Sequence, residues 1–241
     1  MSAHPTMTYV IAAYNEATSL PDSIPRIVER LRALPGSEVV IVENGSTDAT
    51  AAVAAGLAQT YGAGPVIVRH ETSAKGLGNA LRRGLEVARA DRVMLTAADL
   101  PFGFSDLDAA LALHPIPGVV AGSKAHPDSK VNVTFQRRVM SRGLWVLRRV
   151  MFGLDIGDSQ GSVNIERTLG QSLLPDLATT GYFISTEVVV LAAKAGATVI
   201  EVPVDYSAPR IDSKVNPVRD SLDVVREMWA LRSRISARRS R

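Results

Sequence analysis

The chain has 241 residues, of which 46% are hydrophobic, and it contains no cysteine. This length and hydrophobic content favour one large globular domain, and the lack of cysteine excludes disulfide frameworks, thiolate metal sites and cysteine nucleophiles. No run approaches the roughly 18 apolar residues that a membrane span needs, and residues 1–4 carry no basic region before an apolar segment. We therefore expect a cytoplasmic protein.

The net charge of +3 is distributed unevenly along the chain. Residues 232–241 hold five arginines and no acidic residue, and without them the chain has 22 basic and 24 acidic residues. Such an end is typical of a solvated, partly disordered tail. It also suits adhesion to anionic lipid, where each basic residue contributes about 1 kcal/mol. The tail has no interleaved aromatic residues, so we expect no nucleic-acid binding.

Short apolar runs alternate with segments of helical periodicity in the first half of the chain. The pattern predicts strands at residues 8–13, 38–42 and 65–69, and helices at 19–34, from near Asp48, and around Leu81, Leu85 and Val87. This alternation indicates parallel βαβ units with right-handed crossovers. The fold class is therefore predicted as α/β, a single domain with a Rossmann-like, mostly parallel sheet flanked by helices.

The apolar run at residues 92–102 (RVMLTAADLPF) predicts a buried strand that delivers Asp99 to its C-terminal end. Ligands of open parallel sheets bind at the carboxyl ends of the strands, so this carboxylate is a candidate functional group. The alternative is a helix N-cap, since Leu100 and Pro101 suit the start of a helix. Polar loops at residues 14–16 and 43–48 follow two earlier strands, and the three loops together predict a nucleotide-binding rim.

Lys75 and Gly76 lie in a turn, KGLG, that precedes the third predicted helix. Glycines at this position allow a close approach of the backbone, and the helix N-terminus behind them favours a phosphate. A plain loop explains the same residues, because the pattern is neither the dinucleotide fingerprint nor the P-loop. Both interpretations stay open on the sequence.

The second half of the chain starts with a strand at residues 118–124. Residues 136–154 form a basic amphipathic segment with Trp145 and Phe152, which either packs on the core or lies at a lipid surface, and one helix can do both. Asp158 precedes a short strand-like run, a helix is predicted at 181–195, a last strand at 198–204, and a closing helix at 217–232. The loop at 208–214 carries two cations, Arg210 and Lys214, which next to a nucleotide rim are candidates for neutralising diphosphate charge.

Several of these motifs, in this order, resemble family-2 glycosyltransferases: AAYNE at residues 12–16, VIVENGSTDAT at 40–50, KGLGNAL at 75–81 and AADL at 97–100. Later landmarks resemble more narrowly the polyprenyl-phosphate branch, typified by dolichol-phosphate mannosyltransferase. These landmarks are GSK at 122–124, Arg138 with Ser141, DSQ at 158–160, Glu187, EVPV at 201–204 and the loop at 210–214. The resemblance covers residues 9–214.

The resemblance implies a GT-A fold, a GDP- or UDP-sugar donor, and transfer of a hexose with inversion at the anomeric carbon. It also implies roles for individual residues. The donor would be bound by Ala13, Tyr14, Glu16, Glu43, Asn44, Asp48, Lys75, Gly76, Asp99, Arg210 and Lys214. The acceptor phosphate would be bound by Lys124, Arg138 and Ser141, and the candidate catalytic residues are Asp158 and Asp99.

The nature of the acceptor decides whether a base is needed. An alcohol must lose a proton during attack and needs a positioned carboxylate or histidine, whereas a phosphate monoester is already anionic and needs only orientation. Asp158 is the carboxylate that we would assign as base for an alcohol. Its alternative role is to hold the adjacent loop.

The chain departs from the family pattern at informative positions. Ala97 stands where the family has the first acid of Asp-x-Asp, and Asn44 stands where a second acid is common. The loss of a carboxylate weakens a site for Mg or Mn, for which Asp99 is the candidate ligand. Ser162, Val163 and Asn164 replace Gly, Phe and a basic residue. These changes are consistent with metal-weak or metal-independent catalysis, a specialised acceptor, or lost activity.

Three functions therefore follow from the sequence. The leading hypothesis is transfer of a hexose to a polyprenyl phosphate by a protein that lies peripherally at the inner face of the membrane. The second is transfer to a small soluble acceptor, and the third is a nucleotide-sugar-binding protein without catalysis. We expect a glycosyltransferase domain at residues 1–215 and an amphipathic helix with a basic tail at 216–241, and a homodimer is a further candidate assembly.

Overall fold

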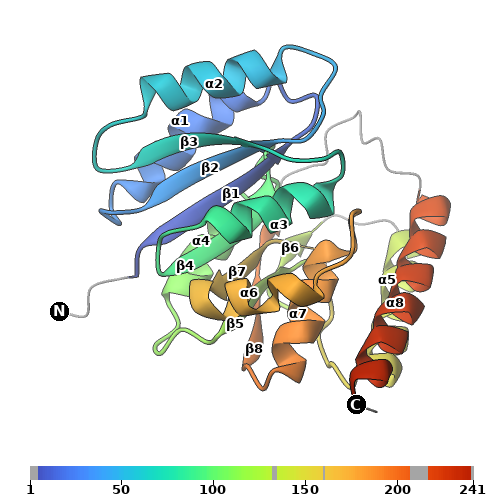
Figure 1. The fold of residues 1–241 in the computed structure, drawn as a ribbon. Helices are drawn as coiled ribbons and strands as arrows, with labels where there is room; N and C mark the ends of the chain where they lie inside the picture. The colour runs from blue at the N-terminus through green and yellow to red at the C-terminus, as the bar shows by residue number, and fades with distance from the viewer. Residues whose placement is uncertain (1–4, 132–134, 160, 207–216, 240–241) are drawn as a thin grey trace.

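A computed structural model describes residues 5–131, 135–159, 161–206 and 217–239, and Figure 1 shows its elements. The strands are β1 (Met7–Ala13), β2 (Glu38–Glu43), β3 (Ile67–Thr72), β4 (Arg92–Ala97), β5 (Val119–Ser123), β6 (Lys130–Val131), β7 (Val163–Glu166), β8 (Val199–Pro203) and β9 (Asp205–Tyr206). The helices are α1 (Leu20–Leu31), α2 (Thr50–Thr60), α3 (Leu77–Val87), α4 (Ser105–Leu111), α5 (Phe135–Phe152), α6 (Arg167–Leu173), α7 (Ile184–Lys194) and α8 (Pro217–Arg239), with a short 3-10 helix at Leu174–Asp176.

The main sheet has seven strands in the order β3-β2-β1-β4-β7-β5-β8, and β6 pairs with β9 in a small separate sheet. All neighbours in the main sheet are parallel except β7, which runs antiparallel to both β4 and β5. The prediction of an α/β fold with a mostly parallel sheet is therefore confirmed.

Two apolar clusters cover opposite faces of the sheet, because successive side chains of a strand point to opposite sides. In β1, Tyr9 and Ile11 belong to the cluster that includes α1, α2 and α4, whereas Val10 belongs to the cluster that includes α3, α6 and α7. In Figure 1, α3, α6 and α7 lie in front of the sheet. The result is a three-layer arrangement with both sheet faces buried.

Helices α5 and α8 pack against each other beside the sheet (Figure 1). Arg232 of α8 donates to the main-chain oxygen of Met151, and Arg234 pairs with the fully buried carboxylate of Glu187 in α7. The prediction of a partly disordered tail from residue 232 is therefore wrong for the part that the structure describes, which is helical to Arg239, whereas Arg232, Ser233, Ser236 and Ala237 are exposed, as expected of a solvated end. A buried acid on another helix supplies the reason, and no local pattern reveals it.

The fourth strand is shorter than the apolar run suggested. β4 ends at Ala97, and a turn with Leu100 at φ 46° follows it. Helix α4 begins at Ser105 with Phe104 at its N-cap position. The N-cap alternative for Asp99 is therefore wrong, and Asp99 lies in the turn that directly follows the strand.

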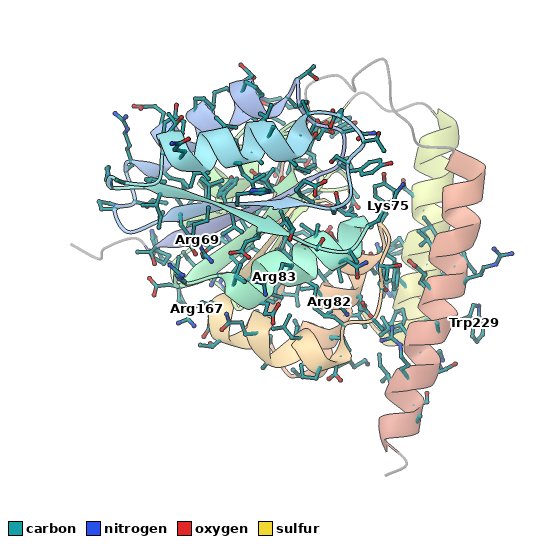
Figure 2. All side chains as sticks on the ribbon, turned by 45° about the horizontal axis from the view of Figure 1, so that its top comes forward. Arg69, Lys75, Arg82, Arg83, Arg167 and Trp229 are labelled. Carbon is teal, nitrogen blue, oxygen red and sulfur yellow. The ribbon has the colours of Figure 1, made fainter. Side chains whose placement is uncertain are left out.

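Helix α8 begins just after the predicted domain boundary at residue 215, which itself lies outside the described residues. Within the described ranges, no helix has both the length and the hydropathy required to span a bilayer. Large apolar side chains are nevertheless exposed on α5 and α8, namely Val146, Val150 and Trp229. Figure 2 shows Trp229 pointing away from the sheet.

The contact between α3 and β1 gives a test of the packing. A Cβ atom added at Gly84 would lie 2.1 Å from Cγ1 of Val10, a fully buried and stiff side chain. We expect Gly84→Ala to destabilise the protein by about 1–3 kcal/mol through overpacking, measured by urea unfolding.

Gly56→Ala in α2 is the matched control, because a Cβ atom there meets nothing within 4 Å. It should stabilise the protein by about 0.5–1 kcal/mol, as Gly to Ala does in an open helix interior. Equal effects of both substitutions would contradict the close packing of α3 on β1.

Candidate functional site

The polar loops meet at the carboxyl edge of the sheet. The parallel strands β1, β2, β4 and β5 end there, and the antiparallel strand β7 begins there, since Val163 pairs with both Leu95 and Ala121. The segment that contains Asp158 precedes β7 and is thereby brought to the same edge. From β1 to β5 there are three strand intervals, which span about 14 Å.

The loops that follow β1 and β2 are joined by hydrogen bonds. The main-chain nitrogen of Asn15 donates to Oγ of Ser46 over 3.1 Å, and the nitrogen of Thr47 donates to Oδ1 of Asn15 over 2.9 Å. Asn15 has φ 56°, a left-handed conformation that Asn tolerates better than most residues. The sequence marked this motif through its neighbours Tyr14 and Glu16, and it did not single out Asn15.

Asp48 forms a second connection between the same loops. Its carboxylate accepts hydrogen bonds from the main chain and hydroxyl of Thr50 and from the nitrogen of Ala17, and the nitrogen of Glu16 donates to the Thr50 hydroxyl over 2.8 Å. The hydrogen bond from the Thr50 hydroxyl is the main reason that the pKa of Asp48 is lowered. Asp48 therefore holds the loop conformation in this structure.

Lys75 lies close to these two loops. Its Nζ sits 4.7 Å from the centre of the Tyr14 ring, a cation–π geometry, and its Cβ would be 3.5 Å from a Cβ at Gly45. Figure 2 shows Lys75 at the end of α3 that lies nearest to the pair α5 and α8. The structure thus brings the predicted donor residues Tyr14 and Lys75 together.

The two glycines of the KGLG turn have a packing role. A Cβ atom at Gly76 would lie 2.5 Å from the carbonyl oxygen of Thr180, and one at Gly78 would lie 2.2 Å from that of Thr179. The nitrogen of Gly78 also donates to the Thr180 oxygen over 2.9 Å. The close backbone approach expected here is thus made by residues 179–180, and phosphate binding at Gly76 stays a prediction.

The end of β2 carries two buried polar side chains. Glu43 accepts a hydrogen bond from the nitrogen of Ser46, and the nitrogen of Asn44 donates to the oxygen of Ala13 over 3.2 Å. Asn44 is 3% exposed, and its Oδ1 atom has no hydrogen-bond partner in the part of the chain that the structure describes. A buried acceptor without a partner costs free energy, so Asn44 is suited to receive a donor from a ligand.

Asp99 is exposed at the centre of the edge, next to the exposed Ala97. Within the described residues, no three acidic or histidine side chains gather as a ready-made metal site. Divalent ions such as Mg²⁺ are held by one or two carboxylates together with substrate phosphates and water. Among the described residues, the carboxylate of Asp99 therefore fits a cation that is completed by a bound diphosphate, and no cluster there forms a metal site by itself.

Lys124 and Asp158 face each other at the end of β5. Nζ of Lys124 lies 3.5 Å from Oδ2 of Asp158, and the Lys124 nitrogen donates to the same oxygen over 3.4 Å. Lys124 also lies over the rings of Phe102 and Tyr206, at 6.0 and 5.8 Å from their centres. The structure thus brings a predicted acceptor residue and the candidate base together, and the loop-holding role of Asp158 is visible in these contacts.

The structure does not describe the side chains of three predicted residues. Arg210 and Lys214 lie outside the described residues, as does the side chain of Arg138. Ser141 is exposed in α5, the helix to which Arg138 also belongs. Sequence reasoning assigned no role to Arg148 and Glu201, although both contact the segment that ends at Asp158.

Comparison with known proteins identifies a family to which the chain is similar. The family model described as Glycosyl transferase family 2 matches residues 8–165. Glycosyltransferase AglD of Haloferax volcanii is 33% identical over 96% of this chain, which spans 39% of AglD. The dolichyl-phosphate beta-glucosyltransferase of Drosophila melanogaster is 28% identical over 93% of the chain and 74% of its own length. The polyprenol monophosphomannose synthase of Mycolicibacterium smegmatis is 28% identical over 95% of this chain and 89% of its own length.

Solved structures of other proteins share the fold of this chain. Glucosyl-3-phosphoglycerate synthase from Mycobacterium tuberculosis, in complex with phosphoglyceric acid, superposes with a TM-score of 0.67 and 19% identity, covering 96% of this chain and 81% of that one. Mannosyltransferase PcManGT from Pyrobaculum calidifontis, in complex with GDP-Man and Mn²⁺, superposes with a TM-score of 0.58 and 21% identity. The match covers 88% of this chain and 59% of that one. At these identities the likeness establishes the fold, and the prediction of a GT-A arrangement is confirmed.

The hydrogen bond between Thr50 and Asp48 predicts a pH effect. Because the pKa of Asp48 is lowered in the folded protein, the stabilisation from its charged form is present above the unfolded pKa and is lost as the pH falls through the folded value. Thr50→Val removes the donating hydroxyl, and the pKa of Asp48 should rise toward its ordinary value in a carboxyl NMR titration.

Thr50→Ser is the control, since it keeps a hydroxyl at the same position and should keep the pKa of Asp48 low. An Asp48 pKa that is the same in Thr50→Val and in the wild type would assign the shift to the main-chain hydrogen bonds instead.

Proposed function

The chain belongs to glycosyl transferase family 2, and we propose that it moves a hexose from a GDP- or UDP-sugar to a polyprenyl phosphate. In this reaction an acceptor phosphate oxygen attacks the anomeric carbon from the side opposite to the nucleotide. The new C–O bond forms as the bond to the nucleoside diphosphate breaks, so the configuration inverts. The observation that carries the proposal is the division of one sheet edge into two halves, with Tyr14 and Lys75 on one side and Lys124 and Asp158 on the other.

The donor half lies at the ends of β1 and β2. The buried Oδ1 atom of Asn44, which has no partner among the described residues, suits an N–H group of a nucleobase. Lys75 and Asp99 then lie toward the diphosphate, and Arg210 and Lys214 would add positive charge there. Such cations stabilise the charge that develops on the leaving group.

The acceptor half lies at the end of β5 and the start of β7. Lys124, with Arg138 and Ser141 of α5, would receive the acceptor phosphate, whose charge then competes with Asp158 for Lys124. A phosphate acceptor is already anionic, so these residues have to orient it and need not remove a proton. The names of the relatives from Drosophila and Mycolicibacterium support an acceptor of this class.

A divalent cation would complete the donor half. Asp99 would be the ligand from the protein, and the remaining ligands would be diphosphate oxygens and water, as Mg²⁺ prefers. Bound there, the cation would neutralise charge on the departing nucleotide. Structures of similar fold that hold Mn²⁺ or Mg²⁺ together with a nucleotide support the presence of a divalent cation in this half.

A lipid acceptor requires access to a membrane. On α5 the exposed side chains Arg142, Val146, Arg149 and Val150 recur at helical spacing, and Arg149 stacks on Trp145 with 5.4 Å to the ring centre. Apolar side chains flanked by arginines are typical of helices that lie in a membrane interface. We place the protein peripherally at the inner membrane face, with this surface of α5 toward the lipid.

Donor and metal use are tested by thermal shift with GDP, UDP and their sugars, each with Mn²⁺ or with a chelator. We expect Mn²⁺ alone to leave Tm unchanged, since Asp99 is a single carboxylate. Once a nucleotide is bound, Mn²⁺ should raise Tm above the value with the nucleotide alone. Asp99→Asn should remove the Mn²⁺ increment and keep the nucleotide shift. A nucleotide shift that is identical in chelator and Mn²⁺ would exclude Asp99 as a metal ligand.

The acceptor is tested with labelled nucleotide sugar and a short-chain polyprenyl phosphate. Labelled product should partition into the organic phase, and Lys124→Ala should raise the acceptor KM by about 10- to 100-fold, because a charged hydrogen-bond partner is lost. Lys130→Ala is the matched control, since Lys130 is an exposed lysine that pairs with the exposed Asp205. Label that stays entirely in a glycosylated aqueous product would replace the lipid by a small soluble acceptor.

The same assay separates membrane contact from acceptor binding. With the acceptor embedded in anionic vesicles, Val150→Asp should reduce turnover, while turnover of the short-chain acceptor in detergent stays unchanged. Equal turnover of wild type and variant on vesicles would exclude this surface of α5 from membrane contact. An absence of turnover with every donor and acceptor would leave a protein that binds nucleotide sugars without catalysis.

A further inference from the structure

The segment from Ile156 to Asp158 is held by Glu201, a residue of β8. One carboxylate oxygen of Glu201 accepts the nitrogen of Gly157 over 2.8 Å, and the other accepts the nitrogen of Asp158 over 3.0 Å. Both oxygens of one side chain therefore bind two successive main-chain amides. Hydrogen bonds to an ionised acceptor are stronger than those between neutral groups, so this pair fixes the orientation of both peptide groups.

The opposite side of the same segment is held by Arg148 from α5. Its guanidinium donates to the carbonyl oxygen of Ile156 and, over 2.8 Å, to that of Gly157. Arg148 is 5% exposed, and burial lowers its pKa, whereas the charges of Asp158 and Glu201 act in the opposite direction. The guanidinium thus makes its hydrogen bonds in a buried setting, where the charges of Asp158 and Glu201 offset part of the cost of burial.

The segment has little room to move between these two groups. A Cβ atom at Gly157 would lie 2.8 Å from Cβ of Ala125, the residue after Lys124. The next side chain along the segment is Asp158, which contacts both the nitrogen and the Nζ atom of Lys124. The hydrogen bonds at residues 156–158 therefore set where Asp158 meets Lys124.

We propose that Glu201 and Arg148 are positioning residues, which hold residues 156–158 so that Asp158 and Lys124 are correctly placed for the acceptor. This inference rests on the proposed function. Arg148 lies in the same helix as Ser141, two turns away, a rise of about 10 Å. Because an α-helix is stiff over this length, Arg148 also fixes the register between α5 and the segment that carries Asp158.

The geometry explains why these particular side chains are required. A Gln at position 201 would offer one oxygen and one NH₂ group, and the NH₂ group would face a main-chain N–H as donor against donor. A Lys at position 148 has a compact ammonium group, whereas the planar guanidinium reaches two successive carbonyls at once. Neither conservative substitution can reproduce the observed contacts.

The decisive variant is Glu201→Gln in the full chain, assayed with the nucleotide sugar and short-chain polyprenyl phosphate. We expect kcat to fall by about 10- to 100-fold, because a small displacement of a reacting group is sufficient for such a loss, while the donor KM stays within about twofold. Glu166→Gln is the matched control, because Glu166 is an exposed acid at the end of β7. A Glu201→Gln variant with wild-type kcat would overturn the positioning role.

Arg148→Lys tests the other side of the segment, and Arg26→Lys is its control, because Arg26 is an exposed arginine of α1 that pairs with Asp22. Arg148→Lys should lower kcat as Glu201→Gln does, with Tm close to that of the control. Wild-type kcat in Arg148→Lys would remove Arg148 from the proposal.

Amide hydrogen exchange at Gly157 and Asp158 provides a measurement that does not depend on activity. Both substitutions should accelerate exchange there and leave the strands of the sheet protected. Unchanged exchange at these two amides would overturn the inference even if transfer occurs. If wild-type protein transfers no sugar, the proposed function fails, and accelerated exchange in the variants would still establish that Glu201 and Arg148 hold the segment.

Discussion

The insertion of β7 between β4 and β5, against the direction of both, is the constraint on which the site depends. Arg92 at the start of β4 is buried, and its Nε donates to Oδ1 of Asn164 in β7 over 2.6 Å. A further guanidinium nitrogen donates to the oxygen of Pro117 over 2.8 Å, just before β5. A buried arginine is strongly unfavourable without such partners. The hydrogen bonds of Arg92 therefore favour the arrangement in which β7 lies between β4 and β5.

This contact gives one of the sequence departures a structural explanation. Asn164 stands where a basic residue is more usual in the family, and here its amide oxygen accepts a hydrogen bond from the buried guanidinium of Arg92. A second basic side chain at position 164 would face Arg92 at close range, which like charges disfavour. The difference at Asn164 is therefore linked to Arg92 in the sheet interior, and it does not by itself indicate a different acceptor.

Much of the fold could be predicted because it depends on local patterns. The strands at residues 8–13 and 38–42 are short apolar runs that end in polar loops, and the structure has them within one residue of the predicted bounds. The direction of β7 could not be predicted in the same way, because alternation of side chains is identical in parallel and antiparallel strands. The helical end of α8 was missed because its partner, the buried Glu187, lies far away in the sequence.

The site shows the same division. The sequence located Tyr14 because polar residues after apolar runs mark strand ends, and it located Lys75 through the KGLG turn and Asp158 through the family resemblance. It could not show that Gly76 faces the carbonyl of Thr180, nor that Glu201 binds the amides of Gly157 and Asp158, since these are contacts between distant segments. Patterns indicate which residues reach the sheet edge, and tertiary contacts decide what each of them does there.

The buried Glu187 connects the C-terminal helix to the turn that begins at Lys75. Its carboxylate accepts the nitrogens of Ala178 and Thr179 and also pairs with Arg234 of α8. The carbonyl oxygens of residues 179–180 in turn contact the two glycines of the turn that begins at Lys75. Without Arg234, the buried carboxylate would keep only its amide donors, and a buried charge with fewer partners is costly. Helix α8 is therefore linked energetically to the turn that begins at Lys75, although it lies far from that turn in the sequence and packs beside α5.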